Sequence, residues 1–140
     1  MPRRDLYHDV VVKALESEGW TITDDPLQVS IGDTDLYVDL AAERVLGAVR
    51  GEVKIAVEIK SFLGASKVED LEMAVGQYNV YRDVLAEVQP DRLLYFAVSR
   101  RVDRSILSSQ FGRLIVERQH LRLVVFDEKE ERRLEWKPEP

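Results

Sequence analysis

The segment 53–62 constrains the fold more than any other part of this chain. From Val53 to Ile59 every second side chain is a branched apolar one, and the residues that alternate with them include Glu58 and Lys60. A period of two is typical of a β-strand that buries one of its faces. The pattern therefore predicts a strand over 53–60, with Glu58 and Lys60 projecting from the same face of a sheet.

Two helices are predicted on either side of this strand. Residues 5–18 have apolar side chains near a spacing of 3.6, with Asp5 as the predicted N-cap and Gly19 placed to end the helix. The second helix begins at Ser66, which forms a capping box with Glu69. Its apolar stripe runs toward residue 88 and predicts a helix packed on the sheet.

The remaining apolar runs predict a mixed sheet. They suggest strands over 20–23, 27–31, 36–40, 45–50, 92–98, 121–126 and 132–136, and helical material over 103–119 that is broken near 111–112. Residues 41–44 favour helix by propensity, whereas a hairpin turn around Gly51 favours a strand for 45–50. We expect an α/β fold, with a mixed β-sheet flanked by helices, in a single domain over 1–140.

The composition excludes several classes of function. There is no cysteine, so disulfides and thiolate metal sites are excluded, and no phosphate loop, nucleophile elbow or zinc spacing is found. No apolar run is long enough to span a membrane and no secretory signal is visible, so we expect a soluble, cytoplasmic protein without membrane contact. The net charge of −6 argues mildly against binding DNA through overall charge.

Asp39, Glu58 and Lys60 are the candidate catalytic residues. An acid upstream of Glu-x-Lys on a strand is the minimal layout of PD-(D/E)xK phosphodiesterases, although alternating charges more often form a solvated strand face. Two carboxylates, with the backbone carbonyl of Ile59 as a further ligand, suit Mg²⁺ or Mn²⁺. The lysine would position water or offset developing negative charge. We expect these side chains to meet in a cleft facing the first half of the 66–88 helix.

Other polar residues are weaker candidates. Gln77 and Tyr81 are one helical turn apart, and Gln-x-x-x-Tyr recurs after the Glu-x-Lys strand in RecB-like nucleases. Tyr81 fits the apolar stripe, so Gln77 is the functional candidate of the two. Glu16 and Glu43 are alternative metal ligands that also suit ordinary surface positions. His8 is expected at the surface or at the boundary of the core.

Five strings in order along the chain resemble the XisH family. They are Asp-Leu-Tyr-His at 5–8, Glu-Gly-Trp-Thr-Ile-Thr-Asp-Asp-Pro at 18–26, Leu-Tyr-Val-Asp-Leu-Ala-Ala-Glu at 36–43, Ala-Val-Glu-Ile-Lys-Ser-Phe-Leu-Gly at 56–64 and Gly-Gln-Tyr-Asn-Val-Tyr-Arg at 76–82. XisH proteins are the fdxN element excision controlling factors, typical of cyanobacteria. The resemblance spans nearly the whole chain.

The resemblance implies a restriction-endonuclease-like fold whose motif falls on Asp39, Glu58, Lys60 and Gln77. It also implies a role in DNA rearrangement, in which a recombinase excises a DNA element with the help of XisH and a companion protein, XisI. A Mg²⁺-dependent endonuclease site would fit this role. The alternative is a catalytically inactive regulatory module that acts through protein–protein contacts. The expected partners are an XisI-like protein, DNA and a second copy in a homodimer.

Overall fold

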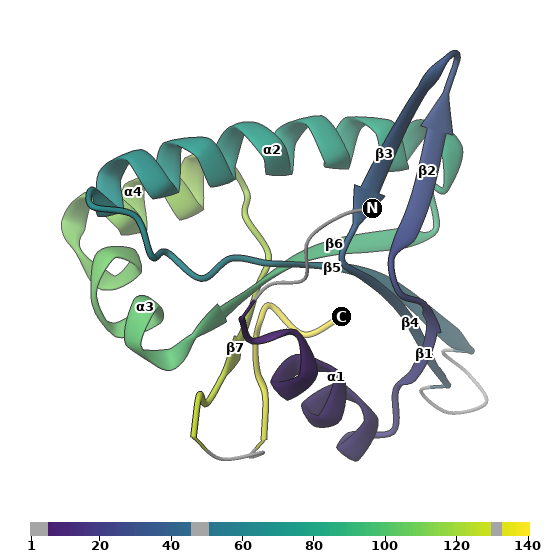
Figure 1. Cartoon of the computed structure of the whole chain (residues 1–140), viewed down its shortest axis with the longest axis horizontal. Helices are drawn as coiled ribbons and strands as arrows, with labels where there is room; N and C mark the ends of the chain where they lie inside the picture. Colours follow the sequence, from purple (N-terminus) through teal and green to yellow (C-terminus); the bar gives the residue numbers. More distant parts are fainter. Residues whose placement is uncertain (1–5, 46–50, 130–132) are drawn as a thin grey trace.

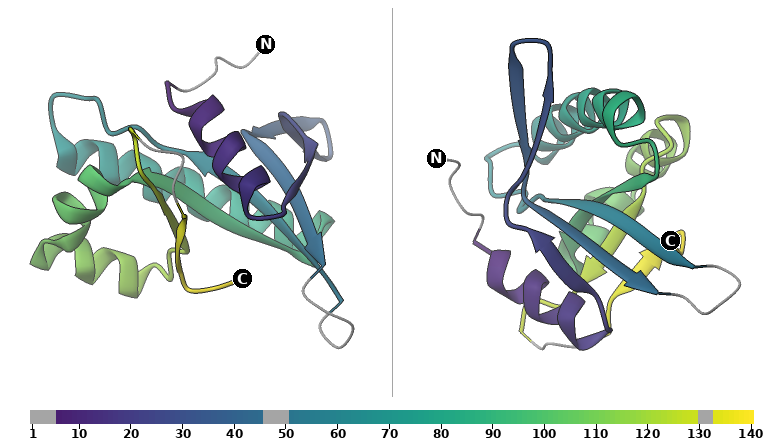
Figure 2. Two further views of the ribbon diagram at one scale, coloured as in Figure 1. Left: turned by 90° about the horizontal axis from the view of Figure 1, so that it is seen from below. Right: turned by 90° about the vertical axis from the view of Figure 1, so that its right-hand side faces the viewer.

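The computed structural model describes residues 6–45, 51–129 and 133–140. A six-stranded sheet has the strand order β1-β4-β5-β6-β7-β8, and β2 and β3 form a separate hairpin (Figure 1). Helix α1 covers one face of the sheet, and α2 lies across the other (Figure 2). The predicted α/β class with a mixed sheet flanked by helices is confirmed. In the described part of the chain, no helix has the length and apolarity needed to cross a membrane.

The elements follow one another along the chain with short connections. The strands are β1 (Thr21–Asp24), β2 (Leu27–Ile31), β3 (Thr34–Val38), β4 (Leu40–Val45), β5 (Glu52–Ile59), β6 (Arg92–Ser99), β7 (Leu123–Phe126) and β8 (Glu135–Lys137). The helices are α1 (His8–Ser17), α2 (Lys67–Val88), α3 (Arg100–Arg104), the 3₁₀ turn η1 (Ile106–Ser108) and α4 (Gln110–Arg118). The neighbours β5, β6 and β7 run parallel, and the other pairs are antiparallel.

Strand β5 separates two apolar cores. Its side chains at Ile55, Val57 and Ile59 belong to the core under α1, whereas Ala56 belongs to the core under α2. Successive side chains on a strand point to opposite faces, so Glu58 lies on the same face as Ala56, toward α2. The alternation of faces predicted for this segment is confirmed, but both faces are buried rather than one, because α1 covers one and α2 the other. The acidic side chain of Glu58 therefore lies in the space beneath a helix.

Helix α2 is fixed across the sheet by its cap and by a buried tyrosine. The backbone amide of Glu69 donates a hydrogen bond to Ser66 Oγ (3.2 Å), as the capping box predicts. The Tyr78 hydroxyl donates to the carbonyl of Leu94 (3.1 Å) and accepts from the backbone amide of Arg122 (3.1 Å). These bonds tie the middle of α2 to β6 and to the residue before β7.

The start of the first helix differs from the prediction. Helix α1 begins at His8, and its N-cap, Tyr7, makes no side-chain capping hydrogen bond. The predicted cap, Asp5, lies outside the described residues. The predicted end is confirmed, because Gly19 follows the helix with a φ of 90°, a left-handed conformation that glycine adopts without the steric cost of a Cβ.

The strands around Asp39 also differ from the prediction. The strand placed over 36–40 is in fact two strands, because β3 ends at Val38, the chain bends at Asp39, and β4 follows. The strand favoured for 45–50 occupies Leu40–Val45 instead, and 46–50 lie outside the described residues. Helix propensity at 41–44 is overridden by pairing with β5, where small alanine side chains fit between the two cores.

The helical region after β6 breaks at different residues from those predicted. The breaks fall at Ser105 and Ser109, and α4 runs unbroken through Phe111 and Gly112. Ser109 is the N-cap of α4, since its Oγ accepts a hydrogen bond from the Gly112 amide (3.0 Å). Gly112 is buried against the carbonyl of Ile106 rather than marking a helix end. The glycine therefore serves close packing, which a sequence alone does not distinguish from a break.

Candidate active site

Asp39 and Glu58 are joined by a reciprocal pair of hydrogen bonds. The backbone amide of Asp39 donates to Glu58 Oε1 (3.1 Å), and the backbone amide of Ile59 donates to Asp39 Oδ2 (2.8 Å). The bend between β3 and β4 makes this possible, because it turns the Asp39 amide out of the strand ladder and toward β5. Each carboxylate uses one oxygen in this exchange, which fixes the two side chains next to each other.

Burial raises the pKa of both acids, and the neighbouring Asp39 carboxylate raises that of Glu58 further. Only 6% of Glu58 is exposed. Its pKa rises to about 8, mainly because burial disfavours the charged form and then because the Asp39 carboxylate lies close by. The pKa of Asp39 is also raised, again chiefly by burial, and the Ile59 amide opposes this shift. Two acids that share one site in this way hold less than their full negative charge near neutral pH.

Lys60 lies beside the pair at the start of the β5–α2 connection. Its Nζ is 3.4 Å from Glu58 Oε2, and its backbone amide donates to the carbonyl of Ala97 in β6 (3.0 Å). A cation at this distance lowers the pKa of Glu58, although burial and Asp39 outweigh it. The acid–acid–lysine set predicted from the sequence is therefore brought together in space.

The loop that follows Lys60 is held by the first turns of α2. Lys67 Nζ donates to the carbonyl of Phe62 (2.5 Å), and the amide of Gly64 donates to Asp70 Oδ2 (2.9 Å). Phe62 has a φ of 54°, a costly conformation for a non-glycine residue, and its ring is buried at 5% exposure. A backbone outlier kept in place by burial next to Lys60 is the kind of strain that clusters at functional sites.

A small cavity opens next to Lys60. It has a volume of about 180 Å³ and is lined by Lys60, Phe62, Leu63, Asp70, Met73 and Ala74. Asp70, Met73 and Ala74 belong to the first half of α2, so the lysine borders a hollow on the side that the sequence predicts. The carboxylate pair is not among the lining residues and lies deeper.

Gln77 and Tyr81 lie on α2 and approach the same two acids from the side of that helix. Tyr81 is buried at 8% exposure, which confirms its place in the core. Its pKa is raised by burial first and then by the negative charges of Glu58 and Asp39, so its hydroxyl faces the site. Gln77 Nε2 donates to this hydroxyl (2.8 Å). Within the described part of the chain, Gln77 Oε1 is buried without a hydrogen-bond partner.

His8 is a site neighbour that sequence reasoning missed. It is 4% exposed, not at the surface, and its Nε2 lies 2.8 Å from Asp25 Oδ1. Burial dominates the pKa of Asp39 and raises it, whereas the nearby His8 lowers it. Helical spacing could have revealed this position, because His8 shares a face with the buried Val11 and Leu15.

Glu16 and Glu43 are not brought to the pair. Glu16 is solvent-exposed near the far end of α1, two turns beyond His8. Glu43 is opposite Lys54 in the β4–β5 ladder, and Lys54 lies four residues before Glu58 on β5. The Oε1 of Glu43 lies 3.6 Å from Arg92 Nη2. Neither carboxylate therefore joins the pair of Asp39 and Glu58. Glu16 faces solvent, and Glu43 pairs with Lys54 and Arg92.

The donor set fits a hard divalent cation only in part. Two apposed carboxylates, each with one oxygen outside the reciprocal hydrogen bonds, offer the ligand type that Mg²⁺ and Mn²⁺ prefer. Their pKa values are raised chiefly by burial, and for Glu58 also by the Asp39 charge, so a cation would favour the charged form of both acids. Over residues 6–45, 51–129 and 133–140, however, no group of three His, Cys, Asp or Glu side chains could hold a metal ion. Water or substrate would have to complete the coordination.

Comparisons with known proteins point to one family. The model of the family described as "XisH protein" matches residues 1–134. A crystal structure of an XisH family protein from Nostoc punctiforme shares 37% sequence identity, covers 94% of this chain and 98% of its own, and has a TM-score of 0.84. An fdxN element excision controlling factor protein from Anabaena variabilis shares 40% identity over 95% and 98%, with a TM-score of 0.84. None of the curated proteins matches.

Proposed function

This chain belongs to the XisH family, and from that premise we propose that it takes part in excision of a DNA element through a metal-dependent phosphodiester site. The site consists of Asp39, Glu58 and Lys60, with Gln77 and Tyr81 above it. The observation that carries the proposal is the buried carboxylate pair, whose raised pKa values are costly for stability and useful for holding a cation. The excision role comes from the name of the Anabaena variabilis relative.

Each residue has a role that follows from its position. Asp39 and Glu58 would hold Mg²⁺ or Mn²⁺, with the Ile59 carbonyl as a further ligand, and the metal when bound would supply activation of water and neutralisation of phosphoryl charge. Lys60, 3.4 Å from Glu58, would orient that water or offset charge that develops on the phosphate. Gln77 keeps the Tyr81 hydroxyl directed at the acids through its 2.8 Å hydrogen bond.

A cleavage assay with a lysine variant tests this proposal. We expect wild type to nick DNA in the presence of Mn²⁺. We expect Lys60→Ala to cleave at least about 100-fold more slowly, because the lysine stabilises the transition state. Lys60→Ala should still bind Mn²⁺ in calorimetry, since both carboxylates remain. Lys54→Ala is the matched control, because Lys54 lies on β5, the strand that ends directly before Lys60, but pairs with Glu43 (4.0 Å). Absence of metal-dependent heat from wild type at millimolar Mn²⁺ would refute the metal site.

A non-catalytic role is the second candidate. It is favoured by the lack, among the described residues, of a three-ligand metal group and by the net charge of −6. In this case the fold would act as a regulatory module that binds an XisI-like companion protein or a second copy of itself. Light scattering and affinity purification with a co-expressed XisI-like protein separate the two candidates. A stable complex with no cleavage by either component would favour the regulatory role.

A further inference from the structure

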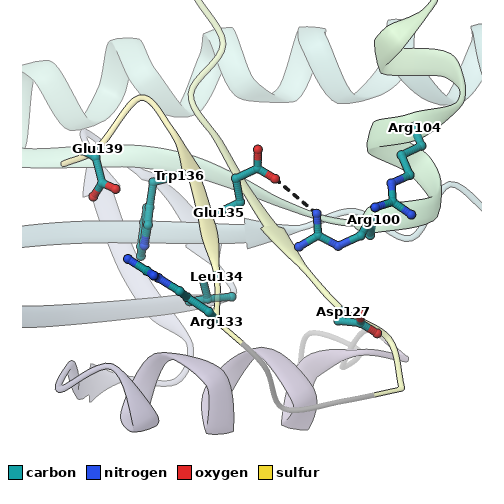
Figure 3. A pocket seen from close by; sticks show the side chains of 8 residues that line it. All are labelled: Arg100, Arg104, Asp127, Arg133, Leu134, Glu135, Trp136 and Glu139. Carbon is teal, nitrogen blue, oxygen red and sulfur yellow. Dashed lines mark hydrogen bonds and ion pairs between the residues drawn. The ribbon is translucent and has the colours of Figure 1, made fainter.

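A second cavity lies between α3 and the C-terminal segment, and it contains none of the candidate catalytic residues (Figure 3). Its volume is about 580 Å³, within the range of small-ligand sites. The side chains that line it come from α3, from the end of β7 and from the segment around β8. They are Arg100, Arg104, Asp127, Arg133, Leu134, Glu135, Trp136 and Glu139.

The cavity occupies a favourable position in the sheet. Arg100 directly follows β6, and Asp127 directly follows β7, its parallel neighbour. Ligands of open α/β sheets commonly bind outside the carboxyl ends of parallel strands, where the following loops diverge. Lys60 follows β5 at the same edge and bonds to Ala97 of β6. The cavity and the candidate active site therefore lie off the ends of adjacent parallel strands.

Two of the three arginines that line the cavity have no acidic partner among the described residues. Arg100 and Arg104 are one helical turn apart, so both reach the same side of α3. Arg100 Nη1 lies 3.2 Å from Glu135 Oε2, whereas Arg104 and Arg133 make no ion pair or hydrogen bond with any described residue. A guanidinium group is a planar fork of donors that matches the oxygens of phosphate. Two such groups are available to an anion in the cavity, Arg104 from the side of α3 and Arg133 from the side of Trp136 (Figure 3).

The acids in the cavity narrow the class of ligand. Asp127, Glu135 and Glu139 also line it, so a bare polyanion would meet repulsion along part of its surface. Carboxylates accept hydrogen bonds from amino and imino groups of nucleobases, whereas arginines hold phosphates. We propose that this cavity binds a nucleotide unit, with its phosphate at the arginines and its base edge at the carboxylates. The unit comes either from a free nucleotide or from single-stranded nucleic acid.

Binding is tested in EDTA with two probes, ATP and a single-stranded oligonucleotide of about ten nucleotides. Arg104→Glu and Arg133→Glu are each expected to weaken binding about tenfold or more, because each removes one phosphate contact and adds repulsion. Arg118→Glu makes the same change of charge on the exposed face of α4, outside the cavity, and should change affinity less than about twofold. Oligonucleotide binding about tenfold tighter than ATP binding identifies nucleic acid as the source, and equal affinity identifies free nucleotide.

Three results would overturn the proposal. They are the absence of binding of either probe by wild type at millimolar concentration, equal weakening by Arg104→Glu and Arg118→Glu, and loss of binding in Glu58→Gln, which would place the probe at the carboxylate pair instead. The assay contains no free metal, so it can succeed where metal-dependent cleavage fails. The nucleotide site and the catalytic site are thus tested separately.

Discussion

Replacing Glu58 with glutamine is expected to raise the free energy of unfolding at pH 9 and to leave it nearly unchanged at pH 5. In the folded protein the pKa of Glu58 is about 8, against an ordinary value of 4.5, because burial and Asp39 disfavour its charge. A raised pKa in an acid means that the folded state binds the proton more tightly. The stability that this tightly bound proton contributes to the folded state is therefore fully present below pH 4.5 and is lost as the pH rises through about 8.

The expected gain for Glu58→Gln at pH 9 is on the order of 5 kcal/mol, since each unit of the pKa shift from 4.5 to about 8 is worth about 1.4 kcal/mol. Glutamine keeps an oxygen that can accept from the Asp39 amide, so the reciprocal bond need not be lost. Urea unfolding in EDTA at pH 5, 7 and 9 measures the difference. Glu16→Gln, at an exposed position, is the control and should shift stability by less than about 0.5 kcal/mol. A gain that does not grow with pH would contradict the raised pKa of Glu58.

Gly112→Ala is expected to destabilise the protein by about 2–4 kcal/mol. A Cβ at this position would lie 1.9 Å from the carbonyl oxygen of Ile106 and 2.8 Å from Leu107 Cα. Both are backbone atoms, so η1 or α4 would have to move, and the cap at Ser109 would move with them. Thermal unfolding should show a fall in Tm of about 10 °C.

Gly76→Ala is the matched control for this loss. Gly76 is also helical, on the exposed face of α2, and a Cβ there meets nothing within 4 Å. Alanine should stabilise α2 by about 0.5–1 kcal/mol, because it restricts the unfolded chain and favours helix. If both alanine variants raised Tm, close packing of Gly112 against η1 would be ruled out.

The elements with strong local signals could be predicted from the sequence. The alternation around Glu58, the cap at Ser66 and the stripe that buries Tyr81 each depend on neighbouring residues, and each is confirmed. The breaks around Gly112 could not be placed, because a glycine packed against a distant carbonyl has the same sequence signal as a glycine that ends a helix.

The residues of the candidate site also divide into those whose position follows from local sequence and those whose position depends on distant contacts. Glu58 and Lys60 share a strand face, so their proximity follows from the period of two. The sequence places Asp39 within a strand over 36–40, whereas the chain bends there, and only the pairing of β4 with β5 fixes its amide on Glu58. The burial of His8 is not predicted, because a histidine near the start of a helix also suits an exposed or boundary position, and only the packing of the folded chain distinguishes these.

The pairing of β4 with β5 has a consequence for how the protein folds. Asp39 and Glu58 are 19 residues apart, and their strands form an antiparallel hairpin, whereas β5 meets its parallel neighbour β6 only after the chain has passed through α2. Contacts that close short loops are entropically cheaper and tend to form first. The two acids would then repel each other already in the folding transition state. We expect alkaline pH to slow refolding of this chain more than it accelerates unfolding.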